Sequence, residues 1–235
     1  MSPLQELNCV NCGAIVAVDR PKGAVVSCEY CGTSFRVPST MTPQPELGDL
    51  ILGADFREPK VPGWIISYED KVEFKNEHVP ELWANFPPAD VISPVIRTPA
   101  PFDDFDVSVT IRFIKGNYEQ ISAGLELRYG DEGDYVFRIS AQGTFQIGWH
   151  KEKEWGDTLM SWTSHPNLRT EMGDPNRLRV VLRGERIRVY LNGVLATSLR
   201  DDHFSLGLIR VVISPGSDKP NTVVAYSDLQ LREIS

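Results

Sequence analysis

The segment Phe105-Asp-Val-Ser-Val-Thr-Ile-Arg-Phe-Ile-Lys115 alternates apolar and polar residues from Phe105 to Phe113. Because successive side chains of a β-strand point to opposite faces of a sheet, this pattern predicts a strand with one apolar face. Clusters of Gly, Asp, Pro and Ser separate further segments of this kind, and Asn192-Gly193 is a typical two-residue hairpin turn. The other alternating segments cover residues 123–129, 135–140, 145–150, 177–183, 187–191, 206–213 and 223–234. No segment has a convincing 3.6-residue period, so we expect residues 48–235 to form an antiparallel β-sandwich.

All four cysteines lie near the N-terminus, in two Cys-x-x-Cys-Gly knuckles. Cys9 and Cys12 form the first knuckle and Cys28 and Cys31 the second, with fifteen residues between the pairs. Four thiolates at this spacing can complete a tetrahedral shell around one Zn²⁺, with iron as the usual contaminant. Protein atoms would fill all four ligand positions, so we expect a structural zinc site that stabilises a segment too short to bury a core of its own.

Two other interpretations of the cysteines are open. Disulfides need an oxidising compartment, but the N-terminal residues have neither the basic nor the apolar region of a signal peptide. A redox-active Cys-x-x-Cys is expected in a βαβ context, which the sequence does not show. The spacing therefore favours zinc, and the reduced cysteines favour the cytoplasm.

Three parts of the chain follow from these patterns. Residues 6–37 resemble a zinc ribbon, with β-prone segments at 14–18 and 33–37 and a hairpin turn expected at 20–23. We therefore divide the chain into a zinc ribbon over residues 1–37, a proline-rich linker over residues 38–47 and a sandwich over residues 48–235. The net charge of −8 argues against broad binding to nucleic acid or to an anionic membrane. No apolar run approaches the roughly 18 residues of a membrane span.

The larger part resembles the bacterial concanavalin A-like jelly rolls of the laminin G and glucanase type. The segments that carry the resemblance are Asp55-Phe-Arg-Glu-Pro59, Gly63-Trp64, Phe105-Asp-Val-Ser-Val109, Gly124-Leu-Glu-Leu-Arg-Tyr129, Gly133-Asp-Tyr-Val-Phe-Arg-Ile139, Asn176-Arg-Leu-Arg-Val180, Val189-Tyr-Leu-Asn-Gly193 and Ala225-Tyr-Ser-Asp-Leu-Gln-Leu231. The resemblance implies an all-β fold with one concave sheet whose outer face binds ligands. The family includes sugar-binding modules, glycosidases, keto-disaccharide hydrolases and sensor modules, so the fold does not choose the function.

Along each predicted strand, every second residue is apolar and should face the core. The residues between them should form a polar outer face on which a ligand could bind. Trp155, in a charged loop, adds an indole that could stack on a sugar ring. The alternative is a solvated face stabilised by cross-strand ion pairs. The expected ligand face comprises Glu126, Arg128, Arg138, His150, Tyr190 and Trp155.

Catalytic and calcium-binding residues are harder to find. Glucanase-type members carry Glu-x-Asp-x-x-Glu on one strand, whereas here Glu126 is followed by Arg128, so no catalytic residue is carried over. The resemblance also implies a Ca²⁺ site between the first and last strands, for which Asp55 and Asp228 are the matching carboxylates; turn or cap roles are the alternative.

The sequence thus predicts a non-catalytic binding protein. The ribbon would dock a protein partner, and the jelly roll would recognise a protein or a carbohydrate. A carbohydrate-active hydrolase, with a carboxylate pair assembled only by folding, and a nucleic-acid-associated zinc-ribbon adaptor are the alternatives.

Overall fold

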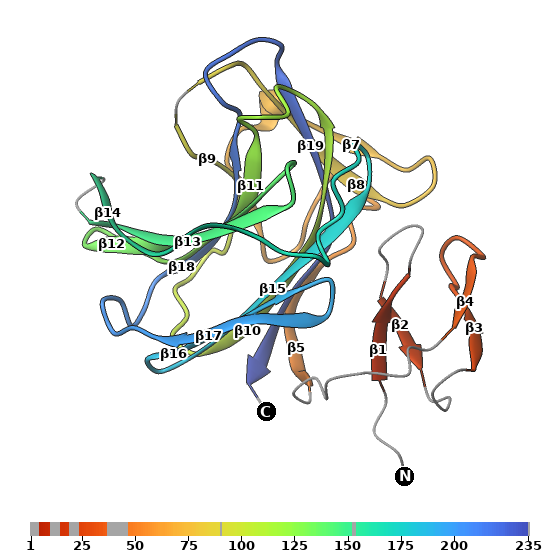
Figure 1. The fold of residues 1–235 in the computed structure, drawn as a ribbon, viewed down its shortest axis with the longest axis horizontal. Coiled ribbons are helices and arrows are strands. Elements are labelled where there is room, and N and C mark those ends of the chain that lie inside the picture. Colours follow the sequence, from red (N-terminus) through yellow and green to blue (C-terminus); the bar gives the residue numbers. More distant parts are fainter. Residues whose placement is uncertain are drawn as a thin grey trace.

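The protein is built almost entirely from antiparallel strands (Figure 1). A computed structural model describes residues 5–9, 15–18, 24–36, 47–89, 91–151 and 154–234. Over these residues the one helical element is the short 3-10 turn η1, Glu69–Lys71, and none is long and apolar enough to cross a membrane. The predicted all-β class is confirmed.

Two sheets form the sandwich. The eight-stranded sheet has the order β17-β16-β15-β10-β19-β8-β7, and β5 also pairs with β19. The seven-stranded sheet has the order β14-β13-β12-β11-β18-β9-β6. The strands of the first sheet are β5 (Leu47–Ala54), β7 (Val72–Lys75), β8 (Glu81–Phe86), β10 (Phe105–Lys115), β15 (Pro175–Arg183), β16 (Arg186–Leu191), β17 (Val194–Arg200) and β19 (Thr222–Ile234). Those of the second are β6 (Ile65–Ile66), β9 (Ser93–Arg97), β11 (Ser122–Tyr129), β12 (Gly133–Ser140), β13 (Thr144–Lys151), β14 (Glu154–Ser164) and β18 (Leu208–Ser214).

The apolar parity of the strands fills the space between the two sheets. Leu125, Phe137 and Ile147 from the seven-stranded sheet meet Val109 and Val180 from the eight-stranded sheet, and none is more than 1% exposed. Burying each such side chain contributes about 1.5–3 kcal/mol. The predicted hairpin turn is also present: Asn192 and Gly193 have φ values of 49° and 81° and join β16 to β17, as a two-residue turn of this type requires.

The N-terminal strands form two separate two-stranded sheets, which lie beside the sandwich in Figure 1. Strand β1 (Gln5–Asn8) pairs with β2 (Ile15–Val18), and β3 (Val25–Ser27) pairs with β4 (Ser34–Arg36). Each pair of strands therefore flanks one of the two cysteine knuckles. The hairpin turn that the sequence predicted at residues 20–23 lies outside the described residues. Most of the expected linker also lies outside them, and β5 begins at Leu47.

Candidate functional site

A polar pocket lies on the outer face of the seven-stranded sheet. Its volume is about 580 Å³, and its charged lining includes Glu126, Asp134, Arg138, His150 and Arg210. Four adjacent strands, β13, β12, β11 and β18, supply these side chains, because each stands on the outward parity of its strand. The cross-strand register places Asp134 opposite His150, and Glu126 opposite Arg210.

Glu126 is one of two deeply buried acids of the pocket. Its residue is only 3% exposed, and its Oε2 lies 3.0 Å from Nε of Arg210. Burial raises the pKa of the Glu126 carboxyl to about 7, although the neighbouring Arg210 opposes the rise. The carboxyl group is therefore poised to gain or lose its proton near neutral pH.

Asp134 and His150 form a second pair beside Glu126. Nδ1 of His150 lies 3.3 Å from a carboxylate oxygen of Asp134, which is also 3% exposed. One ligand atom each from Glu126, Asp134 and His150 lies within 4.8 Å of the others. The pocket thus holds two carboxylates in close proximity, with a cation or an imidazole against each.

Two arginines on this face are held in fixed positions by aromatic rings. The guanidinium of Arg210 lies 3.9 Å from the ring centroid of Tyr129, and that of Arg138 lies 5.3 Å from the ring of Trp162. Arg138 also donates a 2.6 Å hydrogen bond to Oε1 of Gln146. Burial lowers the pKa of Arg138 to about 10, which leaves it protonated at neutral pH. Packing of this kind orients a guanidinium before any ligand arrives.

Two residues expected on the ligand face are elsewhere. The pairing of β11 with β18 shifts between Glu126 and Tyr129, and within this bulge Arg128 has φ 55°. The extra residue turns Arg128 off the outer face, so Tyr129 takes the place there that alternation assigned to Arg128. Tyr190 lies on β16 of the other sheet, where Arg179 covers its ring. The expectation that these side chains share one face with Arg138 and His150 is wrong.

Arg128 instead connects the end of β11 to loops of the opposite sheet. It is 2% exposed and donates hydrogen bonds to the backbone oxygens of Asp103, Gly184 and Phe204 at 2.7–3.0 Å. Its position is that of a structural cation at one end of the sandwich.

The two carboxylates proposed for calcium do not form a metal cluster. The carboxylate of Asp228 accepts hydrogen bonds from Arg177 and Gln230, both at 2.6 Å. The side chain of Asp55 is 73% exposed and bonds to Arg57. A guanidinium on a carboxylate opposes cation binding there, and neither aspartate joins a group of three metal-ligating side chains in the described part of the chain. Asp55 accepts a hydrogen bond from the backbone N–H of Arg57, which fits the turn role that was the alternative for it, whereas Asp228 is an ion-pair partner of Arg177, a role that the sequence analysis did not consider.

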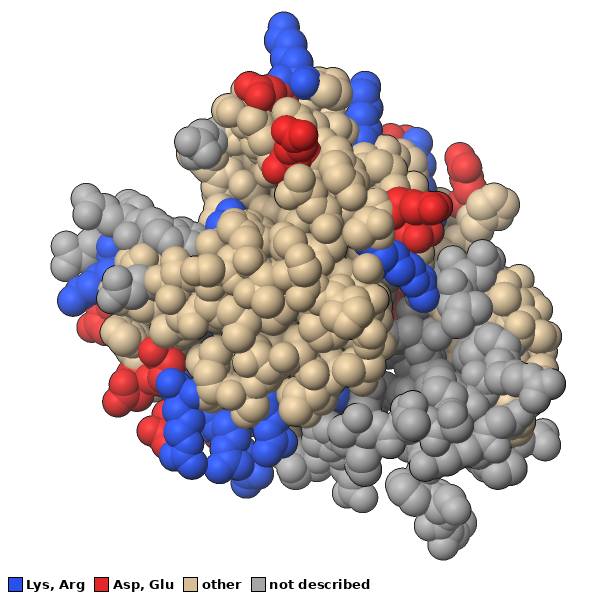
Figure 2. All heavy atoms as spheres, viewed as in Figure 1, with Lys and Arg blue, Asp and Glu red and all other residues tan. Residues whose placement is uncertain are grey.

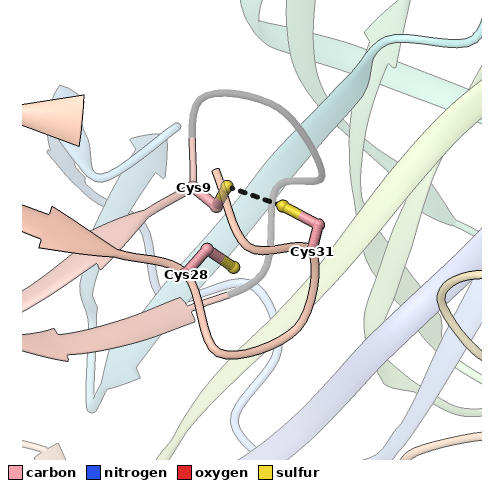
Figure 3. A group of neighbouring side chains, drawn as sticks. All are labelled: Cys9, Cys28 and Cys31. Atoms are coloured by element: carbon pink, nitrogen blue, oxygen red, sulfur yellow. Dashed lines mark hydrogen bonds between the residues drawn. The ribbon is translucent and has the colours of Figure 1, made fainter. Parts of the chain in front are cut away.

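Three of the four cysteines do come together (Figure 3). The thiols of Cys9, Cys28 and Cys31 point toward one another, their sulfurs lie within 4.8 Å of each other, and Cys9 and Cys31 are 3.5 Å apart. A tetrahedral Zn²⁺ site with Zn–S bonds of about 2.3 Å needs sulfurs about 3.8 Å apart, so these residues fit such an ion. Gly32, with φ 73°, donates a hydrogen bond to the Cys28 carbonyl and closes the knuckle. Cys12 lies outside the described residues.

Several members of the pocket escaped the sequence analysis. Arg210 stands on the outward parity of the predicted strand 206–213, so alternation could have identified it. Asp134 lies in β12 just before the predicted strand 135–140, in a segment that the sequence assigned to a turn. Trp162 does not line the pocket but lies against Arg138, and it is 41% exposed on β14, a strand that was not predicted. The backbone of Trp155 pairs with that of His150, but its side chain lies outside the described structure.

Comparison with known proteins supports the fold. No family model and no curated protein sequence matches the chain. Among solved structures, the carbohydrate-binding module CBM66 of Bacillus subtilis is similar, with a TM-score of 0.55 and 15% identity over 73% of this chain and 96% of its own. A prokaryotic β-1,3-1,4-glucanase from a mouse hindgut metagenome has a TM-score of 0.59 and 13% identity over 78% of this chain and 99% of its own. A glycoside hydrolase family 16 endo-glucanase of Bacteroides ovatus has a TM-score of 0.61 and 9% identity over 77% of this chain and 100% of its own.

These likenesses establish the concanavalin-like jelly-roll architecture, which is the class of fold that the sequence predicted. The fold is shared by carbohydrate-binding modules and by glucanases, and identities this low do not decide between the two activities.

Proposed function

We propose that the protein is a non-catalytic carbohydrate-binding protein whose sugar site is the pocket around Glu126, Asp134 and Arg138. The observation that carries the proposal is that each buried carboxylate on the floor of this pocket has a nitrogen-bearing side chain beside it. Acceptors and donors alternate there, with a carboxylate beside Arg210 and another beside His150. Neighbouring hydroxyl groups of a sugar each donate and accept hydrogen bonds, so a floor of this kind suits a neutral polyhydroxyl ligand. The volume of about 580 Å³ lies within the usual range for small-molecule sites.

Binding is tested with the full-length protein on a polysaccharide array, followed by calorimetry with β-1,3-glucan and β-1,3-1,4-glucan. Replacing Arg138 by Ala removes one charge-assisted donor, worth about 1.5–3 kcal/mol, and should weaken binding at least tenfold. Arg57→Ala, which removes a distant exposed arginine, is the matched control and should bind as the wild type does. Wild-type affinity in Arg138→Ala, or no polysaccharide bound at all, would overturn the proposal.

A glycoside hydrolase is the second candidate, and the carboxylate pair favours it. Oxygens of Glu126 and Asp134 lie within 4.8 Å, close to the separation of about 5–5.5 Å in retaining glycosidases. A carboxyl pKa of about 7 also suits a general acid. We favour binding because Arg210 and His150 each engage one of the two carboxylates, as fixed acceptors require. Reducing sugar released from either β-glucan by the wild type, and abolished in Glu126→Gln, would establish the hydrolase instead.

We further propose that Cys12 joins Cys9, Cys28 and Cys31 in one structural zinc site, and that the ribbon docks a protein partner in the cytoplasm. Bound zinc would hold the two knuckles together and leave no open position for chemistry. Support for docking comes from Val25 and Tyr30, which are 60% and 56% exposed beside the second knuckle. A protein that co-purifies with the wild type but not with Tyr30→Ser would support a partner at this surface.

A further inference from the structure

The outer face of the eight-stranded sheet carries a row of arginines in register. Arg183 on β15 is paired with Arg186 on β16, which in turn is paired with Arg200 on β17. Paired residues point to the same face, and neighbouring strands are about 4.8 Å apart. The apolar neighbours Leu182, Ile187 and Leu199 face the other way, toward the core.

A fourth arginine lies one row further along the strands. Arg188 is on the outward parity of β16, opposite Ser198. We call Arg183, Arg186, Arg188 and Arg200 the arginine face. Like charges directly opposite one another destabilise a sheet, so this row has an energetic cost that the fold itself does not require.

Elsewhere on the same sheet, buried or half-buried arginines are paired with carboxylates. Nη1 of Arg177 lies 2.6 Å from a carboxylate oxygen of Asp228, and Nη2 of Arg179 lies 2.5 Å from one of Asp106. Arg112 is paired with Glu81 at 2.9 Å.

On the arginine face, Arg200 contacts Glu185, whereas Arg183, Arg186 and Arg188 have no acidic partner among the described residues. Protection of an exposed sheet edge explains a charge on the edge strand β17 but not on β15 and β16, which are interior strands.

Cations gather on this surface although the chain as a whole is acidic. The chain has a net charge of −8, and Figure 2 shows Lys and Arg side chains gathered at the lower edge of the molecule, below the position of β16 in Figure 1. A local group of cations on an acidic protein attracts an anionic ligand to that one place.

We propose that the arginine face binds an acidic polysaccharide, a chain of uronate residues that lies across β15, β16 and β17. This site is separate from the pocket of the proposed function, which lies on the other sheet. Guanidinium groups pair bidentately with carboxylates, and the row supplies one guanidinium for each strand crossed. Adjacent strands lie about 4.8 Å apart, so the three strands hold their guanidinium groups close enough together for one anionic chain to engage several of them at once.

Other polyanions fit less well. Single-stranded nucleic acid is bound largely by stacking of bases on exposed aromatic rings. The aromatic residue next to the arginine face, Tyr190, is 5% exposed, and the guanidinium of Arg179 lies over its ring. A duplex would need a broader basic surface than these four side chains, beside which Asp104, Glu185 and Asp202 introduce negative charge.

The test compares polygalacturonate with fully methyl-esterified polygalacturonate, which has the same backbone without the charges. In affinity electrophoresis, polygalacturonate in the gel should slow the migration of the wild-type full-length protein, and the methyl ester should not. The double variant Arg183→Gln and Arg186→Gln should bind the acid form at least tenfold more weakly. A control that removes the same charge from exposed sites elsewhere, Arg57→Gln with Lys60→Gln, should stay within twofold of the wild type.

A second readout keeps the proposal distinct from a folding defect. Because the like charges that are removed are solvated and their repulsion is small, the thermal midpoint of the double variant should be unchanged or slightly higher than that of the wild type. Equal binding of acid and ester, or wild-type affinity in the double variant, would overturn the proposal. Stronger binding of oligo-dT or of polyglutamate than of polygalacturonate would also overturn it, and would assign the face to nucleic acid or to an acidic protein segment. Neutral β-glucan binding should be unaffected by the double variant, so the pocket and the arginine face succeed or fail independently.

Discussion

Replacing Glu126 by Gln should change how the stability of the protein depends on pH. The carboxyl of Glu126 has a pKa of about 7 in the folded protein, raised by burial from 4.5. A raised carboxyl pKa means that the folded state holds the proton more tightly than the unfolded state does. Its contribution to stability is therefore complete below pH 4.5 and is lost as the pH rises through 7.

The size of this effect follows from the shift. Each pKa unit corresponds to about 1.4 kcal/mol, so the wild type should lose about 3 kcal/mol of unfolding free energy through Glu126 between pH 4.5 and pH 8. The Gln variant carries no titrating group at this position and should lack this loss. Any effect of leaving Arg210 without its carboxylate should be nearly the same at each pH, so it does not alter the difference between the two pH profiles.

The assay is urea unfolding of both proteins at pH 5, 6, 7 and 8, with Glu69→Gln on the exposed turn η1 as the control. The unfolding free energy of Glu126→Gln minus that of the wild type should rise by about 2.5 kcal/mol from pH 5 to pH 8. The same difference for Glu69→Gln should stay flat. A flat profile for Glu126→Gln as well would refute the reasoning, because it would mean that the carboxyl is hydrated in the folded protein.

Three further predictions concern Arg128, the cysteine cluster and Arg138. Arg128→Ala should lower the unfolding free energy by at least about 3 kcal/mol in urea, because a buried guanidinium and its hydrogen bonds to three backbone oxygens are lost; a loss below about 1 kcal/mol would show that water replaces the guanidinium. Metal analysis should find one zinc per chain in the wild type and much less in Cys28→Ser, with little change in the sandwich because it shares no cysteine with the ribbon; less than half an equivalent in the wild type would rule out the site. Calorimetry with a bound β-glucan should show at least tenfold weaker affinity for Arg138→Ala than for Arg57→Ala.

The strands were predictable because their signal is local. Alternation identified β10 over its full length, since a strand with one buried face must repeat every two residues. The same reasoning located most of the other long strands within two or three residues of their observed ends. The turn at Asn192-Gly193 was predictable for a related reason, since both residues tolerate the positive φ that the turn imposes.

What failed depended on contacts between distant segments. The outward parity of Arg128 is correct for a regular strand, but pairing with β18, about eighty residues later, inserts a bulge after Glu126. Tyr190 has the predicted parity but belongs to the other sheet, and parity alone does not assign a strand to a sheet. The carboxylate pair of Glu126 and Asp134 was missed for a local reason, because Asp134 was placed outside the predicted strand 135–140 although β12 begins at Gly133.

The two outer faces of the sandwich treat charge in opposite ways, and burial explains the difference. In the pocket, Glu126 and Arg210 are at most 9% exposed, and an unpaired charge at that depth would be costly, so each has a partner. On the arginine face the side chains are largely solvated, and unpaired charges cost little there.

Ionic strength therefore separates the two proposed sites. Raising the salt concentration from 50 to 200 mM should weaken the binding of polygalacturonate strongly, because its charges meet solvated arginines. The same change should leave the binding of a neutral glucan to the pocket nearly unaltered, because that contact relies on short hydrogen bonds from which bulk ions are excluded. Equal salt dependence for both ligands would mean that they share one site.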